Sequence, residues 1–416
     1  MKPRHLTERV REALVDRPVV ILIGPRQAGK STLALQLVND GTLVRYVTLD
    51  DAVTRSAARD DPLGFLAGLP HGSVIDEIQH APDLYLAIKA QVDRDHRAGA
   101  FLLTGSADVL VLPDLADALV GRAEILTLLP LSAGEIDGHR EDFPAWAFGP
   151  ATPVHTTVPA QADVIERIVQ GGFPEPALAS GRFRNRWFRA YVTTVVQREV
   201  RELAGIAGLA DLPRLLAMLA ARSGTLLNVA ELSRTSGIPQ TTLRRYLALI
   251  EGAFITSTLP AWTGDAGRRL ARAPKLHLTD SGLAAWLTGS DAGRLSVHRE
   301  RLGALLETYV AMEIRKQLGW SSVDARITHY RSHDGVDVDL VLADRRGRIV
   351  GVEVKASATA RSDDLRGLRR LAERVPGRWE RGVLLYLGRE SVSFAERLHA
   401  LPLTALWETR SDSVAG

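Results

Sequence analysis

The sequence contains no cysteine, which excludes disulfide bonds, thiolate metal sites and cysteine nucleophiles. It also lacks any apolar run that approaches the roughly 20 residues a helix needs to span a bilayer. Residues 1–8 carry charge but no apolar segment follows them, so we expect no signal peptide. Together these absences favour a cytoplasmic protein that does not have a membrane as its partner.

A strong excess of one charge is missing as well. The 416 residues carry a formal net charge of only +3, so the molecule as a whole is not a polycation. Any nucleic-acid surface must therefore come from local clustering of arginine. With 45% apolar and 24% charged residues the composition is that of a globular protein, and the length predicts two or three domains.

The clearest motif is a glycine loop at residues 24–31, Gly-Pro-Arg-Gln-Ala-Gly-Lys-Ser. An apolar run at 19–23 leads into it, and helix-forming residues 32–38 lead out of it. This is the strand–loop–helix context in which backbone N–H groups and a helix N-terminus cradle a polyphosphate. We therefore expect the following residues to bind ATP: Gly24, Pro25, Arg26, Gln27, Ala28, Gly29, Lys30, Ser31 and Thr32.

Within this loop Lys30 is predicted to contact the β- and γ-phosphates, and the Ser31 hydroxyl is predicted to help hold Mg²⁺. P-loop ATPases also need a carboxylate at a neighbouring strand end for Mg²⁺ and a second group that orients the attacking water. The apolar run 71–75 ends in Asp76 and Glu77. Asp76 suits the metal role, and Glu77 suits the catalytic role.

Two further positions are open to more than one interpretation. The strand predicted at 100–106 offers Thr104 or Ser106 at its tip, where a polar side chain can reach the γ-phosphate or the water. The alternative is an ordinary turn in which Ser106 caps the next helix. Arg122 is a candidate for stabilising phosphate charge, either directly or as an arginine finger given to a neighbouring subunit of a homo-oligomer. The alternative for Arg122 is a surface ion pair.

Strands alternate with helices across residues 10–130, which predicts an α/β domain with a mostly parallel, doubly wound sheet. Its nucleotide site should lie at the carboxyl ends of the strands. Residues 137–162 are rich in Pro, Ala, His and Thr without a period, so we interpret them as a surface insertion or linker.

Residues 212–262 predict a helix-turn-helix followed by wing strands, that is, a winged helix. Helical runs at 228–234 and 240–250 flank a turn that contains Gly237. Small polar residues begin the second helix and arginines follow, a pattern suited to a DNA groove and its phosphates. The candidate DNA contacts are Gln240, Thr241, Thr242, Arg244 and Arg245. An arginine-rich wing loop is expected at 268–272. The alternative to DNA binding is a module that serves only protein–protein or interdomain contacts.

The C-terminal part predicts a carboxylate cluster. Strands at 335–342 and 349–356 can form a hairpin that brings Asp339, Glu353 and Lys355 to one spot, with Glu307 supplied by the preceding helix. Two carboxylates, Asp339 and Glu353, would hold Mg²⁺ or Mn²⁺ against a phosphate, while Lys355 positions water or stabilises charge. The Asp…Glu-x-Lys pattern resembles the signature of restriction-endonuclease-like nucleases. A fold of that kind used only for binding or packing is the alternative.

The order of these parts resembles a widespread prokaryotic family of predicted AAA+ superfamily ATPases that carry a C-terminal domain of unknown function. The motifs that carry the resemblance lie at 24–31, 49–51, 74–79, 103–106, 119–122, 171–175, 274–276, 279–283 and 353–355. The resemblance covers nearly the whole chain and implies ATP and Mg²⁺ binding and a connection with DNA. Two departures are Asp337-Val338-Asp339, where the family often has Glu-Val-Asp, and Thr or Ser at the strand tip that is often Asn.

We thus predict three domains: a P-loop domain at 1–165, a helical and winged-helix domain at 166–290, and a nuclease-like α/β domain at 291–416. The function expected first is ATP binding and hydrolysis coupled to DNA. The alternatives are a nucleotide-gated, metal-dependent nuclease and a nucleotide-binding scaffold for a protein partner.

Overall fold

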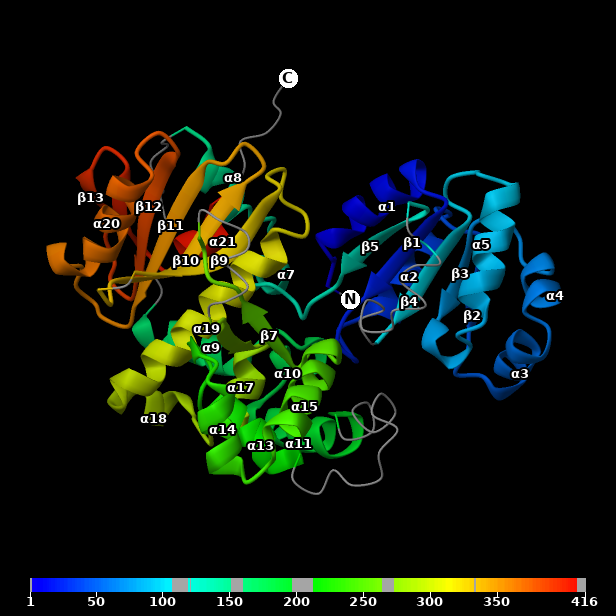
Figure 1. Cartoon of the computed structure of the whole chain (residues 1–416), viewed down its shortest axis with the longest axis horizontal. Helices are drawn as coiled ribbons and strands as arrows, with labels where there is room; N and C mark the ends of the chain where they lie inside the picture. Colours follow the sequence, from blue (N-terminus) through cyan, green and yellow to red (C-terminus); the bar gives the residue numbers. More distant parts are fainter. Residues whose placement is uncertain are drawn as a thin grey trace. The chain divides into compact units, whose positions relative to one another are not determined.

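The computed structural model describes residues 2–106, 119, 121–150, 160–196, 212–263, 273–332 and 334–409 (Figure 1). The chain divides into two units, the first drawn from residues 3–131 and 252–254, and the second from 132–251 and 255–416. Among the described residues no helix is both long and apolar enough to cross a membrane. The wing loop predicted at 268–272 lies outside the described residues.

The first unit is built on a five-stranded parallel sheet with the order β2-β3-β4-β1-β5. Its strands are β1 (Val19–Ile23), β2 (Arg45–Thr48), β3 (Ser73–Asp76), β4 (Phe101–Gly105) and β5 (Ala123–Thr127). The interior strand β1, between β4 and β5, is buried along its whole length, which explains its continuous apolar run. The parallel sheet predicted across residues 10–130 is confirmed.

Helices cover both faces of this sheet because alternate strand residues point to opposite sides. Val20 and Leu22 pack with apolar residues of α1 (Leu6–Asp16) and α2 (Lys30–Asn39). Ile21 and Ile23 pack on the other face with residues of α3 (Ala52–Asp60), α4 (Pro62–Ala67) and α5 (Leu84–Arg94). A 3₁₀ turn, η1 (Ile78–His80), follows β3.

The second unit begins with short helices. They are α7 (Ala133–Asp137), α8 (Phe143–Phe148), α9 (Gln161–Gln170), α10 (Pro174–Ala177), α11 (Gly181–Ala190) and the π-helical turn η3 (Tyr191–Val196). The linker predicted at 137–162 is wrong for α8, where Phe143 is fully buried and the Arg381 guanidinium lies 4.4 Å from the Trp146 ring centroid. A helix of six residues is too short to show a period in sequence. Residues 151–159 lie outside the described part.

A small antiparallel sheet with the order β6-β8-β7 accompanies three helices. In chain order the elements are α13 (Leu212–Ala220), β6 (Thr225–Leu226), α14 (Val229–Ser236), α15 (Gln240–Gly252), β7 (Thr256–Leu259) and β8 (Lys275–Leu278). Leu219, Leu232, Leu243 and Ile250 are completely buried, so the apolar sides of the three helices form a core.

The C-terminal sheet has the order β13-β14-β12-β11-β10-β9 and mixed strand directions. Its strands are β9 (Ala325–Arg331), β10 (Asp337–Asp344), β11 (Ile349–Lys355), β12 (Trp379–Tyr386), β13 (Val392–Ala395) and β14 (Leu398–Pro402). The accompanying helices are α17 (Ser281–Leu287), α18 (Ala292–Val297), α19 (Arg299–Gln317), η4 (Ser362–Leu365), α20 (Arg366–Arg374) and α21 (Ala405–Glu408). The predicted class, a parallel α/β domain with a helical middle and a C-terminal sheet domain, is confirmed.

Asp280 joins two sequence motifs that are more than 100 residues apart. Its Oδ2 accepts a 2.7 Å hydrogen bond from the Gly172 N–H, and its Oδ1 accepts one of 2.8 Å from Leu283 N–H at the start of α17. Gly171 has a φ of +69°, and a Cβ there would lie 2.4 Å from Asp280 Oδ1. The absence of a Cβ at Gly171 therefore allows this close approach, and Asp280 holds the two motifs together.

Candidate functional site

The glycine loop connects the carboxyl end of β1 to the first turn of α2. Gly24 and Gly29 have φ values of +150° and +99°, in the region that favours glycine. A Cβ on Gly24 would also lie 2.2 Å from the Leu128 carbonyl oxygen. Within the described structure no side chain caps the N-terminus of α2. A helix N-terminus carries a partial positive charge and is a place where an anion can bind.

The Lys30 side chain is buried and folds back over this loop. Its Nζ donates to the Gly24 carbonyl oxygen at 2.9 Å and to the Pro25 carbonyl oxygen at 3.0 Å. The ammonium group is thus held at the mouth of a backbone curl, a position from which it can reach a bound phosphate.

Asp76, at the end of β3, is surrounded by hydroxyl groups. Its carboxylate accepts hydrogen bonds from Ser31 Oγ at 3.0 and 3.1 Å, from Tyr46 OH at 2.6 Å and from Thr104 Oγ1. Burial and the neighbouring Asp76 raise the pKa of Tyr46, so its phenol remains a donor at physiological pH. The hydroxyl of Ser31 and the carboxylate of Asp76 form an all-oxygen pair, the donor chemistry that Mg²⁺ prefers.

Glu77 adopts a left-handed conformation with a φ of +58°, which is uncommon for a residue with a side chain. Its N–H donates to Thr104 Oγ1 at 3.2 Å, and its carboxylate accepts from Gln79 Nε2. Gln79 Nε2 also donates to Ser106 Oγ at 3.0 Å. Both polar residues at the tip of β4 therefore contact this site: Thr104 binds Asp76 and Glu77, and Ser106 positions Gln79.

Arg122 lies at the amino ends of the strands, whereas the glycine loop lies at their carboxyl ends. It immediately precedes β5, which runs parallel to β1 from the pair Val19–Ala123 to the pair Ile23–Thr127. At about 3.3 Å per residue, the amino and carboxyl ends of these strands are roughly 13 Å or more apart. The Arg122 side chain forms an ion pair with Asp93. Arg122 is therefore distant from the loop of its own chain, and only its role in a neighbouring subunit stays a prediction.

The second cluster of charged residues is buried in the second, C-terminal unit. The structure brings together Glu307 of α19, Asp339 of β10 and Glu353 and Lys355 of β11, as the hairpin geometry predicts. At its centre lies Lys275 of β8, whose Nζ donates to Glu307 Oε1 at 2.8 Å and to Asp339 Oδ1 at 3.0 Å. Lys355 Nζ donates to Glu353 Oε1 at 2.7 Å.

Burial controls the protonation of this cluster. It raises the pKa of Glu307 and of Glu353, with the charge of Asp339 as the next cause, while the facing Lys275 and Lys355 ammonium groups lower the two pKa values. Burial opposes the charge of Lys275, but Asp339 and Glu307 outweigh it and raise the pKa of that ammonium above its ordinary value. Burial and the charge of Lys275 lower the pKa of the adjacent His277 to about 3, so this imidazole is neutral.

The metal site predicted at Asp339 and Glu353 does not fit this arrangement. Asp339 Oδ1 binds Lys275 Nζ, and Asp339 Oδ2 accepts from Val354 N–H at 3.0 Å. Of the Glu353 oxygens only Oε2 is buried without a hydrogen-bond partner. Across the described residues, no group of three or more His, Asp or Glu side chains is arranged to hold a metal ion.

The predicted DNA contacts lie at the start of α15. Gln240, Thr241, Arg244 and Arg245 are exposed, and Thr242 is partly buried. Gly237 ends α14 in a left-handed conformation with a φ of +77°, which produces the turn between the two helices.

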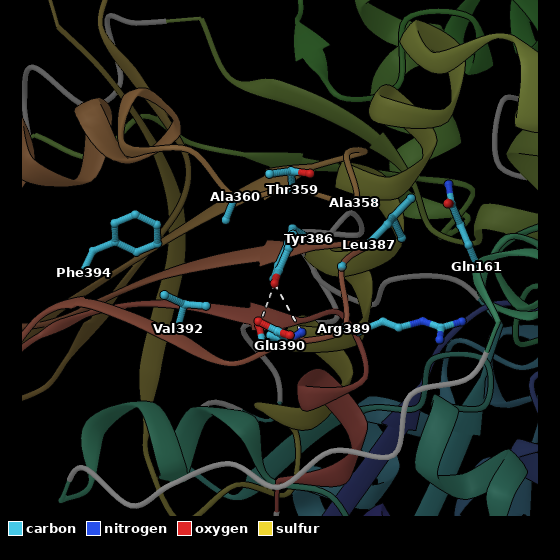
Figure 2. A pocket seen from close by; sticks show the side chains of 11 residues that line it. Gln161, Ala358, Thr359, Ala360, Tyr386, Leu387, Arg389, Glu390, Val392 and Phe394 are labelled. Atoms are coloured by element: carbon cyan, nitrogen blue, oxygen red, sulfur yellow. Dashed lines mark hydrogen bonds between the residues drawn. The ribbon is translucent and has the colours of Figure 1, made fainter.

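A cavity of about 550 Å³ opens at the carboxyl ends of β11 and β12 (Figure 2). Its lining residues are Gln161, Ala358, Thr359, Ala360, Tyr386, Leu387, Gly388, Arg389, Glu390, Val392 and Phe394. Figure 2 shows the Tyr386 hydroxyl turned toward the backbone of Glu390, where it donates to the carbonyl oxygen at 2.6 Å and accepts from the N–H at 3.3 Å. The sequence did not indicate this cavity.

Comparison with known proteins identifies the family of this chain. An uncharacterized protein of Mycobacterium tuberculosis, Rv2008c, is 32% identical over 359 residues, which cover 86% of this chain and 74% of the relative. Mb2031c of Mycobacterium bovis matches with the same identity and coverage. The chain belongs to their family.

Three domain models match this family member. A model described as an AAA domain matches residues 16–137, and two domains of unknown function, DUF8612 and DUF4143, match 161–294 and 302–406. The N-terminal part is thus an AAA-type P-loop domain. The three-domain division predicted from sequence stays a prediction beside the two units of the structure.

The solved structures that match this chain include the Walker-type ATPase of Pyrococcus abyssi. It is 15% identical with a TM-score of 0.40, and the match covers 69% of this chain and 96% of that one. A RuvB variant of Thermotoga maritima is 20% identical with a TM-score of 0.29, and covers 64% and 94% of the two chains.

Three side chains of the glycine-loop site and the carboxylate cluster were not predicted from the sequence. Arg4 donates to the carbonyl oxygens of Ala28 and Leu129 at 2.6 Å each and so braces the glycine loop. Tyr46 binds Asp76 from the neighbouring strand, and Lys275 occupies the carboxylate cluster. A signal existed only for Lys275, which lies in a motif that the family resemblance includes.

Proposed function

We propose that this chain binds and hydrolyses ATP with Mg²⁺ and couples its nucleotide state to DNA. The observation that carries the ATPase proposal is the contact between Ser31 Oγ and Asp76, beside the buried Lys30 ammonium. Ser31 and Asp76 would hold Mg²⁺, which supplies charge neutralisation of the β- and γ-phosphates. Lys30 and the N–H groups of the loop would bind the phosphates themselves.

In this proposal Glu77 orients the attacking water and accepts its proton. The Gln79 amide holds the Glu77 carboxylate, and Thr104 holds the Glu77 backbone in its left-handed conformation. The carboxylate is thereby positioned before substrate arrives, which lowers the reorganisation needed for reaction.

Lys30→Ala tests nucleotide binding. We expect calorimetry to show ATP binding weakened by about 10- to 100-fold, because a charged hydrogen bond contributes roughly 1.5–3 kcal/mol. Lys89→Ala, on α5 of the same unit, is the matched control and should bind ATP as the wild type does. Asp76→Asn should abolish the increase in affinity that Mg²⁺ gives. Equal affinities of wild type and Lys30→Ala would refute the assignment of the loop.

The DNA proposal rests on the segment from α13 to β8. Its element order and its antiparallel sheet β6-β8-β7 support a winged helix, with α15 as the recognition helix. The exposed start of α15 presents Gln240 and Thr241 to bases, and Arg244 and Arg245 to phosphates.

The salt dependence of DNA binding tests this surface. Fluorescence anisotropy with duplex DNA should give affinity that falls steeply with salt, and Arg244→Ala/Arg245→Ala should reduce the log–log slope by about 2. Arg366→Ala/Arg370→Ala removes two exposed arginines of α20 and should leave the slope unchanged. Binding that ignores salt, or an equal loss in both double variants, would rule out α15 as the DNA surface.

Two alternatives remain distinct from this proposal. A scaffold for a protein partner would bind ATP tightly without turnover. A nucleotide-gated nuclease is supported by the restriction-endonuclease-like order of α19, β9, β10, β11 and α20, but it also requires a metal at Asp339 and Glu353.

A further inference from the structure

The carboxylate cluster in the C-terminal unit contains its own cation. Lys275 reaches it from β8, and its side chain is only 8% exposed. Its Nζ contacts two carboxylates from different elements, Glu307 of α19 and Asp339 of β10. We propose that the Lys275 ammonium permanently takes the place of a divalent metal, so that this domain packs and binds but does not cleave phosphodiesters.

Distances and hydrogen bonds support this assignment. The oxygens of Glu307 and Asp339 lie 2.8 and 3.0 Å from Lys275 Nζ, which are hydrogen-bond distances to an ammonium group. Mg²⁺ requires oxygens at about 2.0–2.1 Å in near-octahedral geometry. Val354 N–H holds the other oxygen of Asp339. Both carboxylates thus already bind the same ammonium group.

The charges lead to the same conclusion. Lys355 compensates Glu353 through its own ion pair, so two ammonium groups face three carboxyl groups. A divalent ion at Asp339 would lie within a few ångströms of the Lys275 ammonium in a buried site, where repulsion between like charges is strong. His277, whose Nε2 is 3.9 Å from Glu307 Oε1, is neutral and adds no charge.

Lys275 also has a structural reason to remain in place. It begins β8, which is the central strand of the sheet β6-β8-β7, and Leu276 pairs with both neighbouring strands. Removing the ammonium from the cluster would leave buried carboxylates unpaired. The ion pairs therefore fasten the helix-turn-helix segment to the C-terminal sheet.

Counting bound Mn²⁺ ions tests the proposal on the full-length chain without nucleotide. In a titration, electron paramagnetic resonance measures the free Mn²⁺. The number of bound ions per chain should be the same for wild type and for Glu353→Gln. Lys275→Met should bind one additional Mn²⁺ per chain, an ion that the wild type does not bind at this cluster. Lys316→Met, which removes another buried lysine paired with Glu313, is the matched control and should gain no ion.

Two results would overturn the proposal. One is a Mn²⁺ ion in the wild type that Glu353→Gln removes, because the cluster would then bind metal beside Lys275. The other is a folded Lys275→Met protein, verified by thermal unfolding, that gains no Mn²⁺. Should Lys275→Met fail to fold, the comparison of wild type with Glu353→Gln still decides. Any Mn²⁺ held by Ser31 and Asp76 is common to all the proteins and cancels.

Discussion

Glu77→Gln is expected to lower the rate of phosphate release from ATP by two to four orders of magnitude, the usual contribution of a positioned general base. The amide keeps the size of the carboxylate but cannot accept the proton of the attacking water. ATP affinity should stay within about twofold, because Glu77 is not one of the residues assigned to the phosphates or to Mg²⁺. Steady-state phosphate release and calorimetry measure the two quantities.

Gln79→Ala is the companion variant for this prediction. Gln79 contacts the Glu77 carboxylate and Ser106 without being assigned a proton-transfer role. It should therefore slow phosphate release less than Glu77→Gln does. An unchanged rate in Glu77→Gln would assign water activation to another residue.

Gly24→Ala is expected to abolish ATP binding and to destabilise the first unit. The new Cβ would lie 2.2 Å from the Leu128 carbonyl oxygen, a backbone atom that cannot move aside cheaply, and the φ of +150° adds strain. The loop must therefore shift away from β5, and its N–H groups no longer converge on a phosphate. Calorimetry with ATP and thermal unfolding measure the two losses.

Gly41→Ala separates the steric clash from backbone strain. Gly41 has a φ of +80° and nothing lies within 4 Å of the position its Cβ would take. The substitution should cost only about 1–2 kcal/mol of conformational strain and leave ATP binding intact. Equal losses in the two variants would show that the contact with Leu128 does not define the loop.

The nucleotide site was largely predictable because each of its motifs is a short, contiguous stretch of sequence. The glycine spacing, the apolar run of β1 and the carboxylates that end β3 are all contiguous in sequence. Parallel β1, β3 and β4 are neighbours or next neighbours in the sheet, so their carboxyl ends meet, which explains why Asp76 and Thr104 approach Ser31. The position of Arg122 could also have been predicted from the sequence. A residue that immediately precedes a parallel strand lies at the amino ends of the strands.

The carboxylate cluster was predictable only in part. Strand alternation within one hairpin placed Asp339, Glu353 and Lys355 together, but Lys275 lies 64 residues from Asp339 and belongs to another sheet. Every residue of β8 is buried, so alternation could not show that Lys275 faces carboxylates. The pairing between sheets depends on tertiary packing, which a single sequence does not display.

The rate of phosphate release from ATP by the full-length chain tests the central claim most directly. The measurement compares wild type with Mg²⁺, wild type with EDTA, and Lys30→Ala with Mg²⁺. We predict turnover in the first sample and only background release in the other two, because both Lys30 and the Ser31–Asp76 pair must act together. Turnover that persists in EDTA or in Lys30→Ala, or none in the wild type with bound ATP, would contradict the account.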